Sequence, residues 1–507
     1  MTRPTLHVVG DDAPRATTAV TAAFVGSVVL LAAAVVAAPK AGVLLAPVVA
    51  VAAIVAAAHR RLFGWDTLVR FLAVIIFLIP IKRYTLPGGA GFNLEPYRVL
   101  VALIAAAWTA SLLIDPRVRG RRSGLERPIL LFVGGIFASV AVNDGRIREL
   151  GIQTEVVKTL TFFASFFILF YLAVSLLRTY AQLHALVRTA VICGSVVAFA
   201  ALIESRLHYN VFSHLHPVLP VLQFHDPALT AGLNSAYLDR AGTQRAYASS
   251  AHPIELSAVL VMLVPLAAYL RRVTGNRRWT LSVLLLVLGM LATLSRTGIV
   301  MIVVEGLVFF RLRPVETKRL VPMMVPAFLA VSIALPHTLG SLYAAFFPKG
   351  GLVAEQDAHV TGNAAAADGR LADIGPSLKE FLQTPLLGQG FGTRISQIGG
   401  VQNAVKKTTA RILDDQWLGS LLEVGVIGTL GLLWMFVRTI RRLNRLGRED
   451  DDEVGWLAVA LAASLYAFCV GILTFDAFGF IQVTILTFLL LAVSCSLLKA
   501  SATPAPQ

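Results

Sequence analysis

Long stretches without a charged residue recur along this chain, and they constrain its fold more than any other feature. Residues 22–38, 160–177 and 478–498 are three such stretches. As helices they are long enough to cross most or all of the roughly 30 Å of hydrocarbon in a bilayer, where a helix satisfies its own backbone. Charged residues make up only 14% of the 507 residues, against about 25% in soluble domains. The chain is therefore predicted to be an all-α integral membrane protein.

About fourteen apolar segments, with a range of roughly 12–14, are predicted to be transmembrane helices. The shortest, near Leu68 and Ile129, also fit buried helices of a large soluble core, but the set as a whole does not. The three cysteines lie inside apolar runs and far apart, which predicts packing residues rather than disulfides or a metal cluster. The segments are residues 18–38, 41–58, 66–81, 97–114, 128–142, 159–177, 187–204, 253–270, 279–294, 297–312, 320–336, 414–437, 455–475 and 478–498.

Arginine and lysine are distributed between these segments in a way that predicts topology. The short loops after even-numbered spans are the basic ones, and basic loops stay in the cytoplasm. Both termini then lie in the cytoplasm, with residues 1–19 as a cytoplasmic tail rather than a signal peptide. The net charge of +15 thus reflects topology and contact with anionic membrane lipids, which argues against nucleic acid as a partner.

Two long external loops divide the predicted membrane domain. Residues 1–204 hold spans 1 to 7, and residues 205–252 form the first loop. Residues 253–336 hold spans 8 to 11, residues 337–411 form the second loop, and residues 412–507 hold spans 12 to 14 with a cytoplasmic tail. Connections this long are uncommon unless they are functional or disordered, so the second loop is the expected place for a catalytic or substrate-binding element.

The second external loop contains a helical pattern followed by a glycine turn. Apolar residues at helical spacing over residues 371–382 predict a short amphipathic helix, and Pro385 and the following glycines end it in a tight turn. Gly388 and Gly390 would let backbone N–H groups approach an oxyanion, although glycine turns are common. Residues 350–369, rich in Ala and Gly, fit either a flexible lid or a simple linker.

Two arginines at the outer ends of spans are placed to bind an anion. Arg245 precedes the eighth span, and Arg296 follows Ser295 in the short polar turn between spans nine and ten. A guanidinium matches phosphate oxygens and keeps its charge, so the pair is predicted to hold a diphosphate; each side chain could instead snorkel or pair with a carboxylate. His252 lies at the mouth of a helix opened by Pro253, where the helix dipole favours anions.

Acidic residues open the twelfth span directly after the second external loop. Asp414 and Asp415 either cap this helix or act as a general base, and Glu423 follows in its first turns. No cofactor or metal site is predicted. Four histidines of the first external loop lack the spacing of a known metal site: His208, His214, His216 and His225.

Taken in order, these motifs resemble those of the bacterial O-antigen ligase and polymerase family. The family pattern has an arginine before a His/Asn-Pro stretch that opens a helix and then a Ser-Arg-x-Gly turn, and residues 245–253 and 295–298 are similar. A large external loop follows, with an arginine-bearing helix and an N-P-L-x-G-x-G turn. Arg370 and residues 384–390 resemble these two features, with Thr384 in place of Asn.

The helix after the loop completes the resemblance, which covers about residues 240–440. The family has H/D-N-x-x-L followed by E-x-G-x-x-G, and the segment from Asp414 to Gly428 is similar, with Glu423 as the glutamate. Ligases of lipopolysaccharide assembly usually have His where Asp414 stands. The resemblance therefore leaves a ligase, a polymerase and a transferase for another acceptor open.

The resemblance implies a metal-independent glycosyltransferase of cell-surface polysaccharide biosynthesis in the bacterial cytoplasmic membrane. It would move glycan from a polyprenyl-diphosphate carrier to a glycan or glycolipid acceptor on the external face. Arginines would neutralise the diphosphate leaving group, with Asp414 or Asp415 as the base. The implied diphosphate ligands are Arg245, Arg296, Arg370 and Arg394, and the implied supporting residues are His252, Ser295, Gly388, Gly390 and Glu423.

A transporter or flippase of an anionic glycolipid is the main alternative, since it could use the same spans and arginines. Such proteins often have repeated halves with interrupted helices, and the sequence shows no convincing repeat. Its polarity is concentrated in two central external loops, which suits an outward-facing active site better. A purely structural membrane scaffold would leave the external arginines unexplained.

Overall fold

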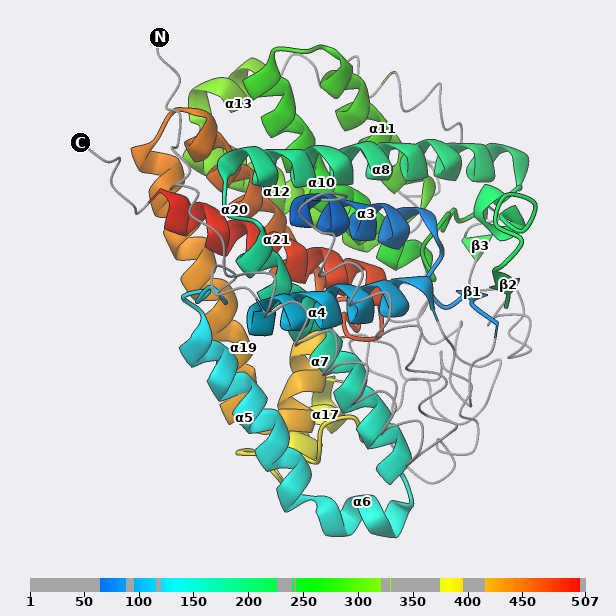
Figure 1. Ribbon diagram of the computed structural model, residues 1–507, viewed down its shortest axis with the longest axis vertical. Helices are drawn as coiled ribbons and strands as arrows, with labels where there is room; N and C mark the ends of the chain where they lie inside the picture. Colours follow the sequence, from blue (N-terminus) through cyan, green and yellow to red (C-terminus); the bar gives the residue numbers. More distant parts are fainter. Residues whose placement is uncertain are drawn as a thin grey trace.

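The computed structural model is almost entirely helical (Figure 1). It describes residues 64–87, 95–114, 120–225, 239–240, 243–320, 329, 374–394 and 415–501. Two predicted spans, 18–38 and 41–58, lie outside these residues, as does nearly all of 320–336. Every other predicted span coincides with a helix, because long apolar segments bury best as helices that satisfy their own main chain.

The described helices differ widely in length. Six are long and apolar enough to cross a membrane, or seven if the bent pair α5 and α6 is one span. This confirms a multi-helix membrane protein, while the total of fourteen spans and their sidedness stay predictions. In chain order the helices are α3 (Trp65–Leu78), α4 (Pro96–Ile114), α5 (Glu126–Val142), α6 (Asp144–Leu150), α7 (Gln153–Leu176), α8 (Tyr180–Leu207), α10 (Pro253–Thr274), α11 (Arg278–Ala292), α12 (Arg296–Leu312), α13 (Pro314–Leu320), α17 (Ile374–Phe381), α19 (Gln416–Glu449), α20 (Glu453–Gly471) and α21 (Ile481–Ala500).

Short extended segments occur near one end of the bundle. Strand β1 (Tyr84–Thr85), after α3, pairs antiparallel with β2 (Gln223–Phe224). Strand β3 (Asp239–Arg240) pairs antiparallel with β4 (Thr243–Gln244). Between α8 and β2, Val211–His214 form a 3-10 helix. These pairs tie the segments before α4 and α10 to the connection that follows α8.

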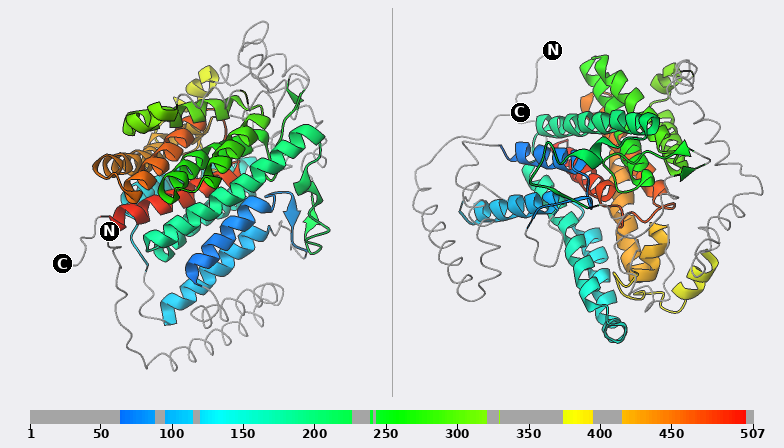
Figure 2. Two further views of the ribbon diagram at one scale, coloured as in Figure 1. Left: turned by 90° about the horizontal axis from the view of Figure 1, so that it is seen from above. Right: turned by 90° about the vertical axis from the view of Figure 1, so that its right-hand side faces the viewer.

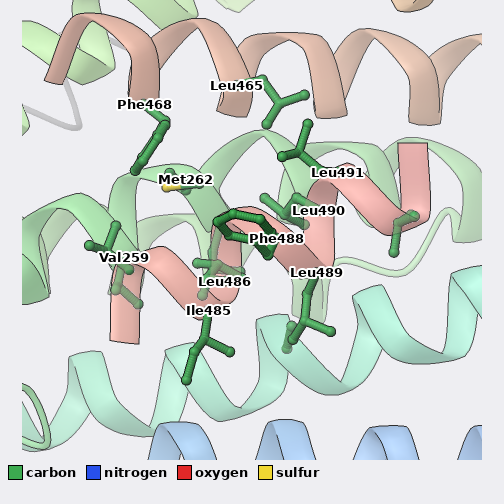
Figure 3. Close-up of a cluster of buried hydrophobic side chains, with 14 of the residues drawn as sticks. Val259, Met262, Leu465, Phe468, Ile485, Leu486, Phe488, Leu489, Leu490 and Leu491 are labelled. Atoms are coloured by element: carbon green, nitrogen blue, oxygen red, sulfur yellow. The ribbon is translucent and has the colours of Figure 1, made fainter. Parts of the chain in front are cut away.

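Helix α21 forms the centre of the bundle. Its apolar stretch is completely buried, and its side chains meet those of α10 and α20, as Figure 3 shows for Phe488, Met262 and Leu465. Polar side chains in this helix bond to its own carbonyls: the Thr487 hydroxyl donates to Val483 O at 2.8 Å and the Ser494 hydroxyl to Leu490 O at 2.7 Å. Such bonds let polar residues lie in an apolar core.

Helices α5 and α7 extend away from the rest of the bundle and are joined at their far end by α6 (Figures 1 and 2). Helix α19 packs along α5 through small residues. A Cβ on Gly135 would lie 2.7 Å from Gly428 Cα, and one on Gly431 would lie 2.5 Å from Phe132 N. Close main-chain approach at glycines is a common way to pack membrane helices. On the opposite flank, α3 lies beside α4 and α8.

The described parts of the loops that the sequence predicts to be cytoplasmic gather at one end of the bundle, called the basic end below. Arg313, after α12, pairs with Asp451, between α19 and α20. The guanidinium groups of Arg313 and Arg272 lie 5.3 and 5.4 Å from the ring of Trp456. The side chain of Lys499 donates to Arg122 O. These loops therefore share one end, as predicted, and their cytoplasmic location remains a prediction.

The sequence placed two spans, 455–475 and 478–498, with almost no connection, and the structure corrects this boundary. Helix α20 ends at Gly471 and α21 begins at Ile481. The nine residues between them, 472–480, form a loop at the end opposite the basic end. They are called the bridging loop below. Because this loop is rich in Ile, Leu and Phe, its hydropathy alone does not distinguish it from a helix.

Candidate functional site

Arg245 lies against the turn between α11 and α12. Its Nε donates to Thr293 O at 3.0 Å, and the N–H of Ala246 donates to Ala292 O at 3.1 Å. Only 5% of Arg245 is exposed, so it does not snorkel towards solvent. The chain segment before α10 thus brings Arg245 to the turn that places Arg296 at the start of α12.

The α11–α12 turn itself is tight and buried. Leu294 has φ of +49°, a left-handed backbone conformation that residues other than glycine rarely adopt. Ser295 is buried, and its hydroxyl has no hydrogen-bond partner among the described residues. A Cβ on Gly298 would lie 2.4 Å from the hydroxyl oxygen of Ser257 in α10. Helix α12 therefore starts pressed against α10, and this fixes the position of Arg296.

Two buried residues that the sequence did not single out hold the segment after Arg245. The Glu204 carboxylate accepts from Ala248 N at 2.7 Å and Tyr247 N at 3.2 Å. The guanidinium of Arg83 donates to the carbonyls of Ala248 and Ser250, the latter at 2.9 Å. Glu204 lies near the end of α8 and Arg83 lies in the turn before β1, and neither position is a local signal of a site. Their contacts join residues that are more than 40 positions apart in the sequence, so no local pattern reveals them.

His252 occupies the position before α10 that the sequence predicts. Its Nδ1 accepts from Ile254 N at 3.1 Å, and its ring stacks on Phe480 with 5.5 Å between centroids. Glu255, in the first turn of α10, accepts from Ala251 N at 2.9 Å and from Gln482 N at 2.8 Å. The starts of α10 and α21 are therefore bound together at this end.

The glycine turn of the second external loop docks on α19, so two motifs that lie apart in the sequence come together. Gln389 N donates to Leu422 O at 2.8 Å, and Gly390 N donates to Glu423 O at 3.2 Å. In the opposite direction, Val426 N donates to Pro385 O at 2.9 Å. The preceding helix α17 confirms the predicted short amphipathic helix.

Glycines at both partners make this docking possible. Gly388 has φ of +69° and Gly390 of +109°, and Gly425 interrupts the helical conformation inside α19 with φ of +65°. A Cβ on Gly425 would lie 2.3 Å from Leu386 O. Glycine alone adopts such angles without strain. The glycines of these two motifs therefore let the main chain of the glycine turn pack against the main chain of α19, and this contact is called the joint below.

Charged residues surround this joint. Glu423 Oε1 accepts from Gly392 N at 3.2 Å. Arg394 pairs with Glu380 of α17 at 2.6 Å, and its side chain is 9% exposed. The charges of Arg394 and Asp476 both act on Glu423. The structure thus brings Gly388, Gly390, Arg394 and Glu423 into one group, while Arg245, Ser295 and Arg296 form another.

Asp415 caps α19. One of its carboxylate oxygens, Oδ1, accepts from Trp417 N at 2.9 Å and Leu418 N at 3.1 Å. Burial raises the pKa of the Asp415 carboxyl, and the two N–H donors act against that increase. Asp414 and Arg370 lie outside the described residues.

The bridging loop lies next to the group that contains Arg296. The hydroxyls of Thr474 and Thr297 lie 2.7 Å apart, next to Arg296. Lys82 Nζ donates to Gly479 O at 3.0 Å. Together with the stacking of Phe480 on His252, these contacts place the loop between the turn that carries Arg296 and the start of α10. The end of the bundle that holds both groups and this loop is called the site end below.

The described residues include no group of three or more His, Cys, Asp or Glu that could hold a metal ion. Of the histidines in the first external loop, His208 Nδ1 lies 2.6 Å from Gln244 Oε1. His214 stacks on Tyr209 with 4.6 Å between ring centroids. His216 and His225 are exposed.

The long apolar helices define the chain as a multi-pass membrane protein. Residues 281–433 match the family model described as O-antigen ligase, so the chain carries a domain of the O-antigen ligase family. The matched segment contains the α11–α12 turn, the glycine turn and the start of α19. No curated protein matches the sequence.

Proposed function

We propose that this protein transfers glycan from a polyprenyl-diphosphate carrier to an acceptor hydroxyl on the external face of the bacterial cytoplasmic membrane. One observation carries the proposal. The segment that matches the O-antigen ligase family contains the glycine turn docked on α19 and the turn that bears Arg296. Arg245, from outside that segment, packs on the same turn. The site end thus combines two cations with a loop shaped by glycines.

In the proposed reaction, Arg245 and Arg296 hold the diphosphate of the donor. The acceptor oxygen forms a bond to the anomeric carbon, and the bond from that carbon to the diphosphate oxygen breaks with its electron pair. Fixed positive charge stabilises the oxygen that gains this pair. Because diphosphate is a good leaving group, the remaining task is to orient donor and acceptor.

The other two predicted diphosphate ligands, Arg370 and Arg394, have different support from that of the arginine pair. Arg370 is included only on the family resemblance. Arg394 is engaged by Glu380 at 2.6 Å, so we assign it to the joint between α17 and α19 and only secondarily to the diphosphate. Ser295 and His252 flank the arginine pair in sequence, and we assign them supporting roles.

Purified full-length protein in lipid nanodiscs provides the test, with a polyprenyl-diphosphate glycan as donor and a hydroxyl-bearing glycan as acceptor. A new glycosidic product is expected from the wild type. Arg245→Ala and Arg296→Ala should each abolish it while leaving membrane insertion intact. The matched control is Arg441→Ala, an exposed arginine near the basic end of α19. Full activity in either site variant would contradict the proposed diphosphate clamp.

The alternative function, a flippase for an anionic glycolipid, would use the same arginines without forming a glycosidic bond. An assay of the same protein in sealed vesicles distinguishes the two functions. Movement of the lipid-linked glycan across the bilayer without any product would support the flippase and contradict the transferase.

A further inference from the structure

The bridging loop carries one acidic residue, Asp476, that no motif of the family resemblance includes. The loop is fixed on the first residue of α19. Gln416 N donates to Ile472 O, and Phe478 N donates to Gln416 Oε1, both at 2.8 Å. Asp476 therefore lies within a short segment whose two sides are held by a single glutamine.

Helix geometry relates the residue that holds this loop to Glu423. Gln416 and Glu423 are seven residues apart in the part of α19 that precedes the break at Gly425. Residues at this spacing lie on the same face of a helix, about 10 Å apart along its axis. The loop is thus held at the start of the face that bears Glu423.

A ring of Phe163 in α7 gives a second, independent placement. Its centroid is 4.8 Å from that of Phe478 in the bridging loop and 5.1 Å from that of Phe391 in the glycine turn. The neighbour of Phe391, Gly392, donates its N–H to Glu423. The bridging loop and the glycine turn therefore adjoin on either side of one aromatic ring.

The loop also reaches the arginine pair. Thr474 contacts Thr297, the residue after Arg296, at 2.7 Å. Two residues of extended chain span at most about 7 Å, so Asp476 lies close to this contact as well. Its Oδ1 accepts from Gly479 N at 3.2 Å, which orients the carboxylate within the loop.

The charges in this region favour a proton acceptor over a further diphosphate ligand. Among the described residues, the charges of Asp476 and Arg394 act on Glu423, and Arg394 itself pairs with Glu380 of α17. Lys82 Nζ, which donates to Gly479 O of the same loop, is a further cation here. The Asp476 carboxylate is itself an anion, so it repels a diphosphate. A neutral acceptor hydroxyl is not repelled, and a carboxylate can accept its proton.

We propose that Asp476, next to Glu423, takes the proton from the acceptor hydroxyl. This inference rests on the proposed transferase function. The proton moves to the Asp476 carboxylate as the acceptor oxygen bonds to the anomeric carbon, and the bond from this carbon to the diphosphate oxygen breaks. The electron pair leaves on the diphosphate, next to Arg245 and Arg296. Donor and acceptor are thus activated from opposite sides of the bridging loop.

The test uses full-length protein in nanodiscs with the polyprenyl-diphosphate glycan donor and the hydroxyl acceptor. For Asp476→Asn, turnover should fall about 10²- to 10⁴-fold, the usual contribution of general base catalysis, while the KM for the donor stays within about twofold. Asp476→Glu should retain part of the activity. The control is Leu473→Ala, on the same loop and 51% exposed, which should turn over like the wild type.

Two further measurements separate proton transfer from a structural role. The wild-type rate should rise with pH along a limb that is lost in Asp476→Asn. Added formate should restore part of the rate of Asp476→Ala, because a small carboxylate can occupy the vacated position. A lower rate with an unchanged pH profile and no rescue by formate would overturn the inference.

The outcomes also separate this inference from the function on which it rests. If Asp476→Asn is as active as the wild type while Arg296→Ala is inactive, the inference is wrong and the transferase stands. If the wild type forms no product with any acceptor, the proposed function fails and the inference fails with it.

Discussion

The two ends of the helix bundle use their charged residues differently. At the basic end, the contacts around Trp456 are between side chains: Arg313 pairs with Asp451 and, together with Arg272, lies against Trp456. At the site end, the contacts around Arg245 are between side chains and main chain: Arg245 donates to a carbonyl of the α11–α12 turn, and Glu204 accepts from two backbone N–H groups. Contacts of the first kind hold helices together, and contacts of the second kind shape loops. Substitutions at the basic end should therefore reduce stability, and those at the site end should reduce activity.

The largest expected effect is that of Gly425→Ala. The new Cβ would lie 2.3 Å from Leu386 O at a residue with φ of +65°, so the glycine turn cannot stay docked on α19. A displacement of about 1 Å at a reacting centre can cost about 100-fold in rate, and we expect at least this loss of glycan transfer in the nanodisc assay.

Gly419→Ala is the matched control for this prediction. Gly419 belongs to the same helix, and a Cβ there would meet nothing within 4 Å. Its activity should equal that of the wild type. If Gly425→Ala were equally active, the main-chain joint would not be needed for the reaction.

Glu204→Gln should have the next largest effect. Hydrogen bonds to a charged group contribute about 1.5–3 kcal/mol, and a neutral amide replaces this acceptor for the segment that follows Arg245. We expect a rise in the KM for the donor of roughly tenfold, which corresponds to about 1.4 kcal/mol. Steady-state kinetics at varied donor concentration measure it. Glu149→Gln, on the exposed helix α6, is the control, and equal KM values for the two variants would contradict a role of Glu204 in donor binding.

Trp456→Ala tests the opposite end. Replacing a buried tryptophan costs about 3–5 kcal/mol, so the melting temperature of the purified protein should fall clearly, while activity per folded molecule stays within about twofold. Trp434→Ala, at a tryptophan that is 40% exposed, should lower the melting temperature less. A specific loss of turnover in Trp456→Ala would mean that the two ends are not independent.

The smallest effect is expected for Asp415→Asn, since asparagine also caps helices well. Burial raises the pKa of the Asp415 carboxyl in the folded state. The folded protein therefore holds this proton more tightly than the unfolded chain, and the resulting stabilisation is present below about pH 4 and is lost as pH rises through the folded-state pKa. Asparagine removes this dependence.

Melting temperatures across pH and turnover at neutral pH check this prediction. Asp415→Asn should be as stable as the wild type or slightly more stable at neutral pH, with activity within about twofold. Asp415→Ala, which lacks the capping oxygen, should be destabilised by about 1 kcal/mol. An inactive Asp415→Asn would make Asp415 the base and remove the need for Asp476.

The sequence predicts the helices far better than the contacts between them. Length, hydropathy and helical period are local properties, so they identify α7, α10 and the short helix α17 directly. The motifs also indicate Arg245, Arg296 and Glu423 as site residues. Arg83, Glu204 and Asp476 carry no local signal, because each gains its meaning from a segment far away in the chain. The bridging loop could not be predicted for a related reason, since its apolar residues resemble the end of a transmembrane helix.

The complete burial of α21 has a consequence for how the protein is made. This helix follows every other described helix in chain order, and domains begin to form from the N-terminal side during synthesis. The other spanning helices are therefore made before the helix around which they pack, and the bridging loop is fixed at both ends only when α21 follows it. A chain whose synthesis stops before α21 would have its other spans inserted but would lack the contacts of α21 with the site end. Synthesis of α21 is therefore the step that completes the active protein.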